Sequence, residues 1–419
     1  MILPYKPTLL LNGIFLAGIW AMATQPCLFA QTAAEKDGRH RARELGIVVG
    51  KIPTGRWNAI TDVAGVLVGQ TTIIRGSGAL RPGEGPVRTG VTAVFARKDI
   101  WSNGVFAATH TFNGDGEMTG THWIRDLETL NYPVMLTNTG SVGGVMDAVS
   151  QYATAKHPEH RWDFLPVVAE TFDGSLNDIH GRHVHYDDVA AAMDSAKDGP
   201  VEEGNAGGGT GMVCFGFKCG IGTSSRQLPE SQGGYRVGVL VQANFGSREQ
   251  LTVNGVPVGV EIPDRVPAAT PSPAKPNEAK RDEAKPDQKE GSIIIVLATD
   301  APLSSRQLER VAQRTAIGMA RTGGTSGNSS GDIFIAFSTA NVIPLRGSDK
   351  ELSIRLLTTE RIDPVFRAAV EATEEAILNA LTMGKTMEGV NGHVAYQLPY
   401  DRLAAIMAKY GRPLTPASH

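Results

Sequence analysis

The pair Gly291-Ser292 stands where a polar segment ends and an apolar run begins. A serine at the start of a strand is common and by itself needs no function. Cleavage of the bond before Ser292, however, would leave this residue with a free α-amine beside its own hydroxyl. Such an amine titrates at about pH 7.7–8.0, close enough to neutral to accept the hydroxyl proton. One residue would then supply both the nucleophile and the general base of a serine hydrolase.

The residues before this bond fit such a cleavage. Glycine at position 291 tolerates the strained backbone that a bond under attack adopts, which a Cβ would resist. Residues 264–290 are rich in Pro, Ala, Lys, Glu and Asp and contain almost no large apolar side chain. Such a composition cannot bury enough surface to offset the entropy of ordering it. We therefore expect 264–290 to be an exposed linker whose new end moves away after cleavage.

Three other patterns fit a chemical role less well. Ten histidines would allow a Ser-His-Asp triad, yet no Gly-x-Ser-x-Gly elbow sits between a strand and a helix. Three histidines lie within 180–185, but such a segment is more typical of a solvated loop, and the zinc motif HExxH is absent. The glycine run 207–211 lacks the Lys and Ser/Thr of a phosphate-binding loop. We therefore expect neither a metal nor an organic cofactor.

Apolar strands must position the reactive residues. The content of Val and other β-branched or apolar residues predicts strands over 87–95, 236–243, 292–299 and 332–339. Residues 293–298 are apolar without interruption. This pattern predicts a strand that is covered on both faces.

Helices are expected to alternate with these strands. The sequence predicts helices over 141–155, over 304–321 and from 363 to 384. Ser304 and Gln307 form a capping box for the second helix. Asp363 is the expected N-cap of the third, with Pro364 in its first position. The alternation indicates one α/β body that the linker interrupts once.

The composition and the first 30 residues indicate the cellular compartment of the protein and the partners it lacks. Lys6, an apolar stretch from Leu9 to Ala23, and Ala30 before Gln31 are typical of a secretory signal peptide. The stretch is short for a membrane span, so we expect a periplasmic or secreted protein without a stable span. The net charge of −3 and the absence of a basic cluster argue against a nucleic-acid partner.

The chain has three cysteines, and Cys27 would leave with the signal peptide. Cys214 and Cys219 could pair in an oxidising compartment. The absence of a CxxC motif or a metal-ligand spacing favours two small buried thiols instead.

Six segments resemble, in the same order, motifs of the DmpA family of L-aminopeptidase/D-esterases and β-peptidyl aminopeptidases. They are Asn58–Gly69, Asn113–Gly120, Gly207–Met212, Val241–Gly246, Gly291–Leu303 and Ser330–Asn341. The resemblance extends from about Arg43 to Leu403 without the linker. It implies a four-layer α/β/β/α sandwich of the N-terminal-nucleophile-like type. The single catalytic domain would consist of a large subunit (31–291) and a small subunit (292–419), after removal of the signal peptide (1–30).

The resemblance also implies roles for single residues. Ser292 takes the position of the nucleophile, which cleavage after Gly291 would expose. Asn244 matches the asparagine of the oxyanion hole, where one side-chain donor contributes a factor of about 10²–10³ in rate. Ser330 and Asp332 match a serine and an acidic residue that orient the new amine and complete the proton path. The family often has glutamate at the second position, so Asp332 is a departure with a shorter reach.

Two further residues match positions that contact substrate. Glu170 corresponds to an acidic residue that meets the free amino group of the substrate, an interaction suited to a buried carboxylate. Phe172 stands where relatives commonly carry a tyrosine, so a hydroxyl donor is missing here. We expect this departure to alter substrate preference.

The resemblance therefore implies a self-cleaving serine aminopeptidase. It would remove N-terminal residues from short peptides, amides or esters through a seryl-acyl intermediate, and it would form homo-oligomers of the processed subunits. Two alternatives share the fold: a self-processing amidase acting on non-peptide amides, and a non-catalytic secreted binding protein. The presence of both Ser292 and Asn244 counts against the second alternative.

Overall fold

The computed structural model describes Met1 and residues 38–158, 165–264, 291–345 and 351–415. Apart from Met1 and Asp264, the predicted signal peptide and the predicted linker lie outside these residues. Within the described ranges, no helix has both the length and the apolar character that crossing a bilayer requires.

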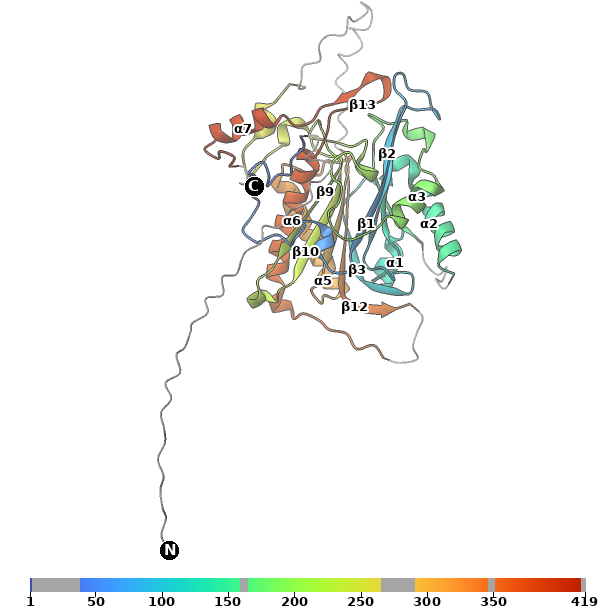
Figure 1. Ribbon diagram of the computed structural model, residues 1–419, viewed down its shortest axis with the longest axis vertical. Coiled ribbons are helices and arrows are strands. Elements are labelled where there is room, and N and C mark those ends of the chain that lie inside the picture. The colour runs from blue at the N-terminus through green and yellow to red at the C-terminus, as the bar shows by residue number, and fades with distance from the viewer. Residues whose placement is uncertain (2–37, 159–164, 265–290, 346–350, 416–419) are drawn as a thin grey trace, which may run out of the picture.

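Two β-sheets lie face to face between two pairs of helices (Figure 1). The six-stranded sheet has, in order, β4 (Thr129–Leu130), β3 (Asn103–Gly114), β12 (Gly331–Pro344), β11 (Ile293–Thr299), β10 (Arg236–Ala243) and β9 (Ile221–Gln227). The four-stranded sheet has β1 (Leu67–Arg75), β2 (Val87–Phe95), β5 (Val134–Asn138) and β6 (Val167–Thr171).

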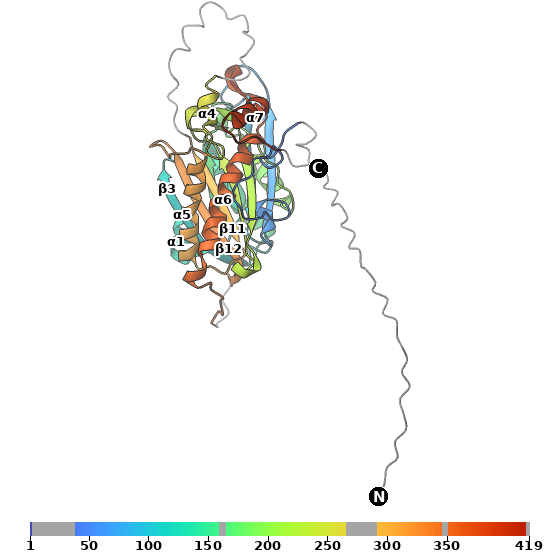
Figure 2. The same cartoon turned by 90° about the vertical axis from the view of Figure 1, so that its left-hand side faces the viewer.

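Helices cover the outer face of each sheet (Figures 1 and 2). Helices α5 (Ser305–Arg321) and α6 (Asp363–Thr382) pack on the six-stranded sheet, whereas α2 (Val142–Lys156) and α3 (Tyr186–Asp194) pack on the four-stranded sheet. The expected four-layer α/β/β/α sandwich is confirmed. Smaller elements are α1 (Thr121–Leu127), α4 (Val258–Glu261), α7 (Tyr400–Lys409), β7 (Val213–Cys214), β8 (Phe217–Lys218), β13 (Met387–Glu388) and β14 (Val394–Ala395).

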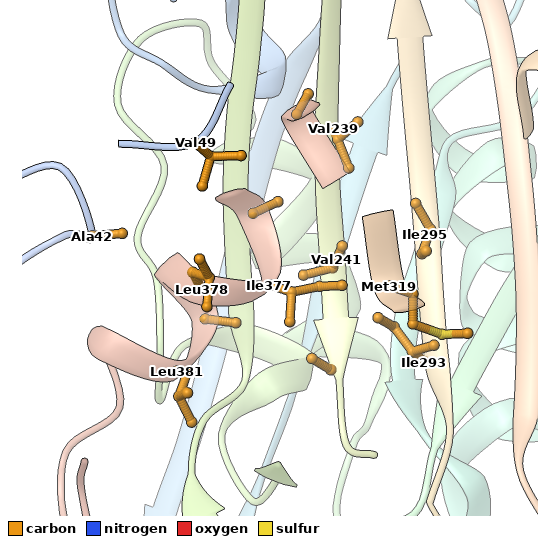
Figure 3. Close-up of a cluster of buried hydrophobic side chains, with 14 of the residues drawn as sticks. Ala42, Val49, Val239, Val241, Ile293, Ile295, Met319, Ile377, Leu378 and Leu381 are labelled. Atoms are coloured by element: carbon orange, nitrogen blue, oxygen red, sulfur yellow. The ribbon is translucent and has the colours of Figure 1, made fainter. Parts of the chain in front are cut away.

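Strand β11 shows why its sequence is apolar at consecutive positions. Ile293, Ile295 and Leu297 belong to the core beneath the helices, and the residues between them belong to the core between the two sheets. Figure 3 shows Ile293 and Ile295 on the same side as Val241 of β10 and Ile377 of α6. Because successive side chains of a strand point to opposite faces, a strand between two cores must be apolar throughout.

The predicted elements agree with the structure in most places. The strands predicted over 87–95 and 236–243 are β2 and β10, and the capping box is present, with Ser304 Oγ accepting from the Gln307 N–H at 3.3 Å. The predicted N-cap of α6 is wrong: Ile362 caps this helix and Asp363 lies in its first turn. A 3₁₀ turn over Thr359–Arg361 already brings Ile362 into helical dihedral angles, so the helix starts one residue early.

A buried ionic cluster joins α6 to β9 and to the N-terminal segment. Arg226, which is fully buried, donates to Glu375 at 2.8 Å and to Glu371 at 3.3 Å. Arg43 donates to both oxygens of Glu375, at 2.7 and 2.8 Å, and Asn58 donates to the same carboxylate at 2.5 Å. Burial alone would raise the pKa of Glu375, but Arg226 and Arg43 outweigh it and hold that pKa below its ordinary value.

The two strands that follow the predicted cleavage site lie side by side in the centre of the six-stranded sheet, with strands that precede the site on both sides. The neighbours β11 and β12 come from the predicted small subunit and pair in parallel. They lie between β3 and β10, which come from the predicted large subunit and pair with them antiparallel.

Candidate active site

Ser292 lies directly before β11 and is 6% exposed. Because β10 and β12 flank β11, the residue after β10 and the first residue of β12 both reach it. The Asn244 N–H donates to the Ser292 carbonyl at 3.0 Å. The Gly331 N–H donates to Ser292 Oγ at 3.1 Å. The strand on one side thus holds the Ser292 backbone, and the strand on the other side holds its hydroxyl.

The residue before the serine must be glycine for a steric reason. A Cβ at position 291 would lie 1.9 Å from the Asn244 carbonyl oxygen and 2.9 Å from Asn244 Nδ2. The close approach of Asn244 therefore requires glycine at this position, and the role of Gly291 in a strained bond stays a prediction.

Ser330 connects the carbonyl before Ser292 to an acidic side chain. Ser330 Oγ lies 2.5 Å from the Gly291 carbonyl oxygen and 2.6 Å from Asp332 Oδ1. Ser326 donates to the other oxygen of Asp332. A hydroxyl has only one proton to donate, so Ser330 can donate either to the Gly291 carbonyl or to Asp332.

The Asn244 side chain is 8% exposed and has a defined orientation. Its Oδ1 accepts from the Val213 N–H at 2.9 Å. The amide nitrogen consequently faces Gly291, where it can donate to an oxygen that becomes negative during reaction at this carbonyl.

Glu170 reaches the same region from the four-stranded sheet. It lies in β6, is 4% exposed, and accepts from the Glu117 N–H at 3.1 Å and from the Thr139 hydroxyl. Burial raises the pKa of Glu170, and these two hydrogen bonds offset part of that rise.

Gly116 lies between this carboxylate and the strand end beside Ser292. A Cβ on Gly116 would be 3.3 Å from Glu170 Oε1 and 3.0 Å from the Cα of Gly331. Since the Gly331 N–H donates to Ser292 Oγ, only Gly116 lies between the carboxylate and the backbone that holds this hydroxyl. The two sheets therefore bring Glu170 near Ser292.

Phe172 directly follows β6 and is 52% exposed. Its ring packs over Gly174, where a Cβ would lie 2.5 Å from the ring. Its role as a substrate contact stays a prediction.

The histidines of 180–185 do not all behave as expected of a solvated loop. His180 and His185 are exposed. His183 is buried, and its ring nitrogens have partners there, with Asp178 at 2.9 Å and Arg75 at 3.2 Å. In the part of the chain that the structure describes, no group of three or more His, Cys, Asp or Glu side chains is arranged to hold a metal ion.

Cys214 and Cys219 form a disulfide, so the prediction of two free thiols is wrong. Cys214 ends β7 and Cys219 directly follows β8, and the hairpin of these two strands brings their Cα atoms within 5.6 Å. This pairing depends on the hairpin turn, which a count of cysteine spacings does not reveal.

Sequence reasoning missed several groups that complete the site. The N–H groups of Val213 and Gly331 are backbone donors, so their residue types carry no signal of the role. Ser326 stands in the glycine- and serine-rich run 323–331, and that composition could have singled it out.

Comparison with known proteins agrees with this geometry. The pattern of peptidase family S58 matches residues 58–395. The β-peptidyl aminopeptidase BapA of Sphingosinicella microcystinivorans is 48% identical over 381 residues, which cover 91% of this chain and 94% of that protein.

Two solved structures of aminopeptidases are also similar. The L-aminopeptidase D-Ala-esterase/amidase of Ochrobactrum anthropi, described as a new variant among the Ntn hydrolase fold, has a TM-score of 0.78 at 43% identity, covering 90% of this chain and 99% of that one. A β-aminopeptidase of a Burkholderia species has a TM-score of 0.78 at 42% identity, covering 89% and 99%.

Proposed function

The chain belongs to peptidase family S58 and is an aminopeptidase, and on this premise we propose that it activates itself by cleaving the bond between Gly291 and Ser292. One observation carries the proposal. Ser330 Oγ lies 2.5 Å from the carbonyl oxygen of this bond while the Gly331 N–H holds Ser292 Oγ beside it. These contacts polarise the carbonyl that must be attacked and fix the oxygen that attacks it.

The proposed cleavage is an acyl shift followed by hydrolysis. Ser292 Oγ attacks the Gly291 carbonyl carbon, and its proton ends on the Ser292 nitrogen as the C–N bond breaks. Water then hydrolyses the resulting ester to a Gly291 carboxylate and a free Ser292 hydroxyl and amine. Ser330 and the Asn244 amide stabilise the carbonyl oxygen while it is negative.

In the processed enzyme, the same groups would act on a substrate. The Ser292 amine takes the hydroxyl proton, Oγ attacks the substrate carbonyl, and the leaving amine receives a proton. Water then releases the acyl group. Glu170 binds the ammonium group of the substrate, which restricts the enzyme to N-terminal residues. We propose short peptides with an N-terminal β-amino acid as the first class to test, because BapA is named a β-peptidyl aminopeptidase.

Denaturing electrophoresis and N-terminal sequencing of the purified protein test self-cleavage. The wild type should give two fragments, the smaller beginning Ser-Ile-Ile-Ile, and Ser292→Ala should stay intact. Ser330→Ala should slow cleavage by about 10²-fold, whereas the neighbouring Ser329→Ala should have little effect. A folded wild type that remains one chain would refute the proposal.

Chromogenic anilides test the specificity. A β-alanyl anilide and an L-alanyl anilide should be compared with their N-acetylated forms. Acetylation removes the ammonium group that Glu170 would bind, so acetylated substrates should not react. Comparable rates with and without the acetyl group would contradict the role of Glu170.

We also propose export and assembly of the processed units into homo-oligomers. The signal-like residues 1–30 and the Cys214–Cys219 disulfide support export, since disulfides persist in oxidising compartments. Periplasmic protein should begin at or near Gln31, and its mass by sedimentation should exceed that of one processed unit. A full-length cytoplasmic monomer would contradict both.

A further inference from the structure

The β7–β8 hairpin lies against the segment that carries Asn244. Phe215 and Gly216 form its turn, with φ of +49° and +69°, and the Cys214–Cys219 disulfide closes it. The left-handed conformation is uncommon for phenylalanine and persists where the surroundings fix it. Phe215 is fully buried, so the packing around it does this here.

Three contacts join the hairpin to the Asn244 segment. The Val213 N–H donates to Asn244 Oδ1 at 2.9 Å, and the Phe215 N–H donates to the Phe245 carbonyl at 2.9 Å. The Phe215 ring meets Phe245 edge-on, with ring centroids 5.0 Å apart. A Cβ on Gly246 would lie 2.3 Å from the same ring, so glycine leaves room for it. The hairpin thus contacts Asn244 and the two residues after it.

The contact with Val213 decides which end of the Asn244 amide faces the reacting bond. An asparagine amide has an acceptor oxygen and a donor nitrogen, which exchange places when the group turns by 180°. A backbone N–H can pair only with the oxygen, so the nitrogen faces Gly291. With the amide reversed, its oxygen would face the developing negative charge and repel it.

Lys218 holds the other end of the same peptide group. Its side chain is fully buried, and Nζ donates to the carbonyls of Met212 at 2.9 Å, Gly209 at 3.4 Å, and Cys219. The Met212 carbonyl and the Val213 N–H belong to one planar peptide unit. Lys218 therefore fixes the plane whose N–H orients Asn244.

We propose that hairpin 213–219, closed by its disulfide and anchored by Lys218, is a positioning element that keeps the donor end of the Asn244 amide toward the reacting carbonyl. The proposal rests on the proposed function of Ser292 and adds to it positioning roles for Lys218 and for the Cys214–Cys219 disulfide. The rates of self-cleavage and of turnover then depend on the hairpin, whereas substrate affinity depends on it little.

A double-mutant cycle tests this role. Cys214→Ala/Cys219→Ala is made in the full chain alone and together with Asn244→Ala, and kcat, KM and the rate of precursor cleavage are measured with a β-alanyl anilide as the substrate. The cysteine variant should lose about tenfold in kcat with KM within about twofold. Asn244→Ala should lose about 10²–10³-fold, and the combined variant should lose no more, because both changes remove the same donor.

Two results would overturn the proposal: a cysteine variant with wild-type kcat, or losses that multiply in the combined variant. Lys218→Met, which keeps the length but removes the donors, should reproduce the kcat loss independently. Melting curves check the fold. If the cysteine variant does not fold, a dithiol reductant applied to processed wild-type enzyme gives the same comparison, the dithiol being oxidised as the disulfide becomes two thiols.

The same assays separate this proposal from the proposed function. A wild-type chain that neither cleaves itself nor hydrolyses the anilide overturns the function, and the hairpin's role with it. An active wild type with an equally active cysteine variant overturns the hairpin's role alone.

Discussion

Charged side chains are buried in two regions of the protein, which differ in the charge of the groups that contact them. In the cluster beneath α6, Glu375 meets Arg43 and Arg226, and its pKa is held below the ordinary value. On the side of Ser292, Glu170 and Lys218 are just as deeply buried, yet their hydrogen-bond partners among the described residues are neutral. Burial raises the pKa of Glu170 and lowers that of Lys218 to about 7.

The difference separates buried charges that have an oppositely charged partner from buried charges whose protonation can change. A buried pair is costly to break because either partner left alone is a desolvated charge. A buried charge without an opposite partner has its pKa moved toward working pH, where it can gain or lose a proton or accept an oppositely charged ligand. The ammonium group of a substrate would give Glu170 the opposite charge that the protein does not place in contact with it.

Removing the carboxylate of the buried ionic cluster should have the largest effect on the free energy of unfolding. Glu375→Leu leaves the buried Arg226 and the partly exposed Arg43 without their shared carboxylate, and should lower the free energy of unfolding by about 3–5 kcal/mol. Urea unfolding is measured in a Ser292→Ala background, so that a single chain unfolds. A loss below about 1 kcal/mol would show that Glu371 alone can pair with Arg226.

Neutralising Glu170 should cost activity while sparing stability. Glu170→Gln keeps an acceptor for the Glu117 N–H, and its amide can donate to the Thr139 hydroxyl, which turns to accept. The variant has no charge for an ammonium group, so kcat/KM for free-amine substrates should fall about 10²-fold, or about 2.7 kcal/mol. The control is Glu117→Gln, since Glu117 contacts Glu170 through its backbone.

The pH profile of kcat/KM sharpens this prediction. Because the pKa of Glu170 is raised, the carboxylate takes up a proton as pH falls through that pKa, and binding of the ammonium group is lost. The Ser292 amine must also be unprotonated to act as the base, so the wild-type profile should fall more steeply at low pH than that of Glu170→Gln, which keeps only the titration of the amine. Identical limbs would assign the titration to another group.

Removing the charge of Asp173 should have a smaller effect, on how the free energy of unfolding depends on pH. It is fully buried, Asn177 donates to it at 3.0 Å, and burial raises its pKa from 3.8 to about 7. The folded state then binds this proton more tightly than the unfolded state, so the stabilisation is present at low pH and is lost as pH rises through 7. In the Ser292→Ala background, the free energy of unfolding in urea should fall between pH 5 and 7 by about 2 kcal/mol more with Asp173 than with Asp173→Asn. Equal losses would contradict the shift.

Removing an exposed ion pair should have the smallest effect on the free energy of unfolding. Lys156 lies 2.7 Å from Asp194 between α2 and α3, with both side chains about half exposed, and it helps to lower the pKa of Asp194. Solvent screening limits such a pair, so Lys156→Ala should change the free energy of unfolding by less than about 1 kcal/mol. A loss above 2 kcal/mol, measured as for Glu375→Leu, would show that exposure does not separate the two kinds of pair.

The sequence predicted those parts of the fold and site that depend on local patterns. The apolar run of β11 and the Ser304 capping box follow from periodicity and spacing, and the family motifs marked Ser292, Asn244 and Glu170. The Cys214–Cys219 pairing and the Val213 N–H contact depend on a hairpin turn and on backbone groups, which residue types do not encode. The reason for Gly291 also required the position of a distant carbonyl.

The place of β11 and β12 between β3 and β10 has a consequence for how the enzyme is made. If the bond before Ser292 is cut as proposed, these two strands belong to a separate polypeptide, and each of them remains hydrogen-bonded to a strand of the other polypeptide. Unfolding would release two molecules, and reassembly would become a second-order encounter that dilution disfavours. The mature enzyme would then form only once, from its precursor, and its working lifetime would be set by how slowly it unfolds rather than by an equilibrium.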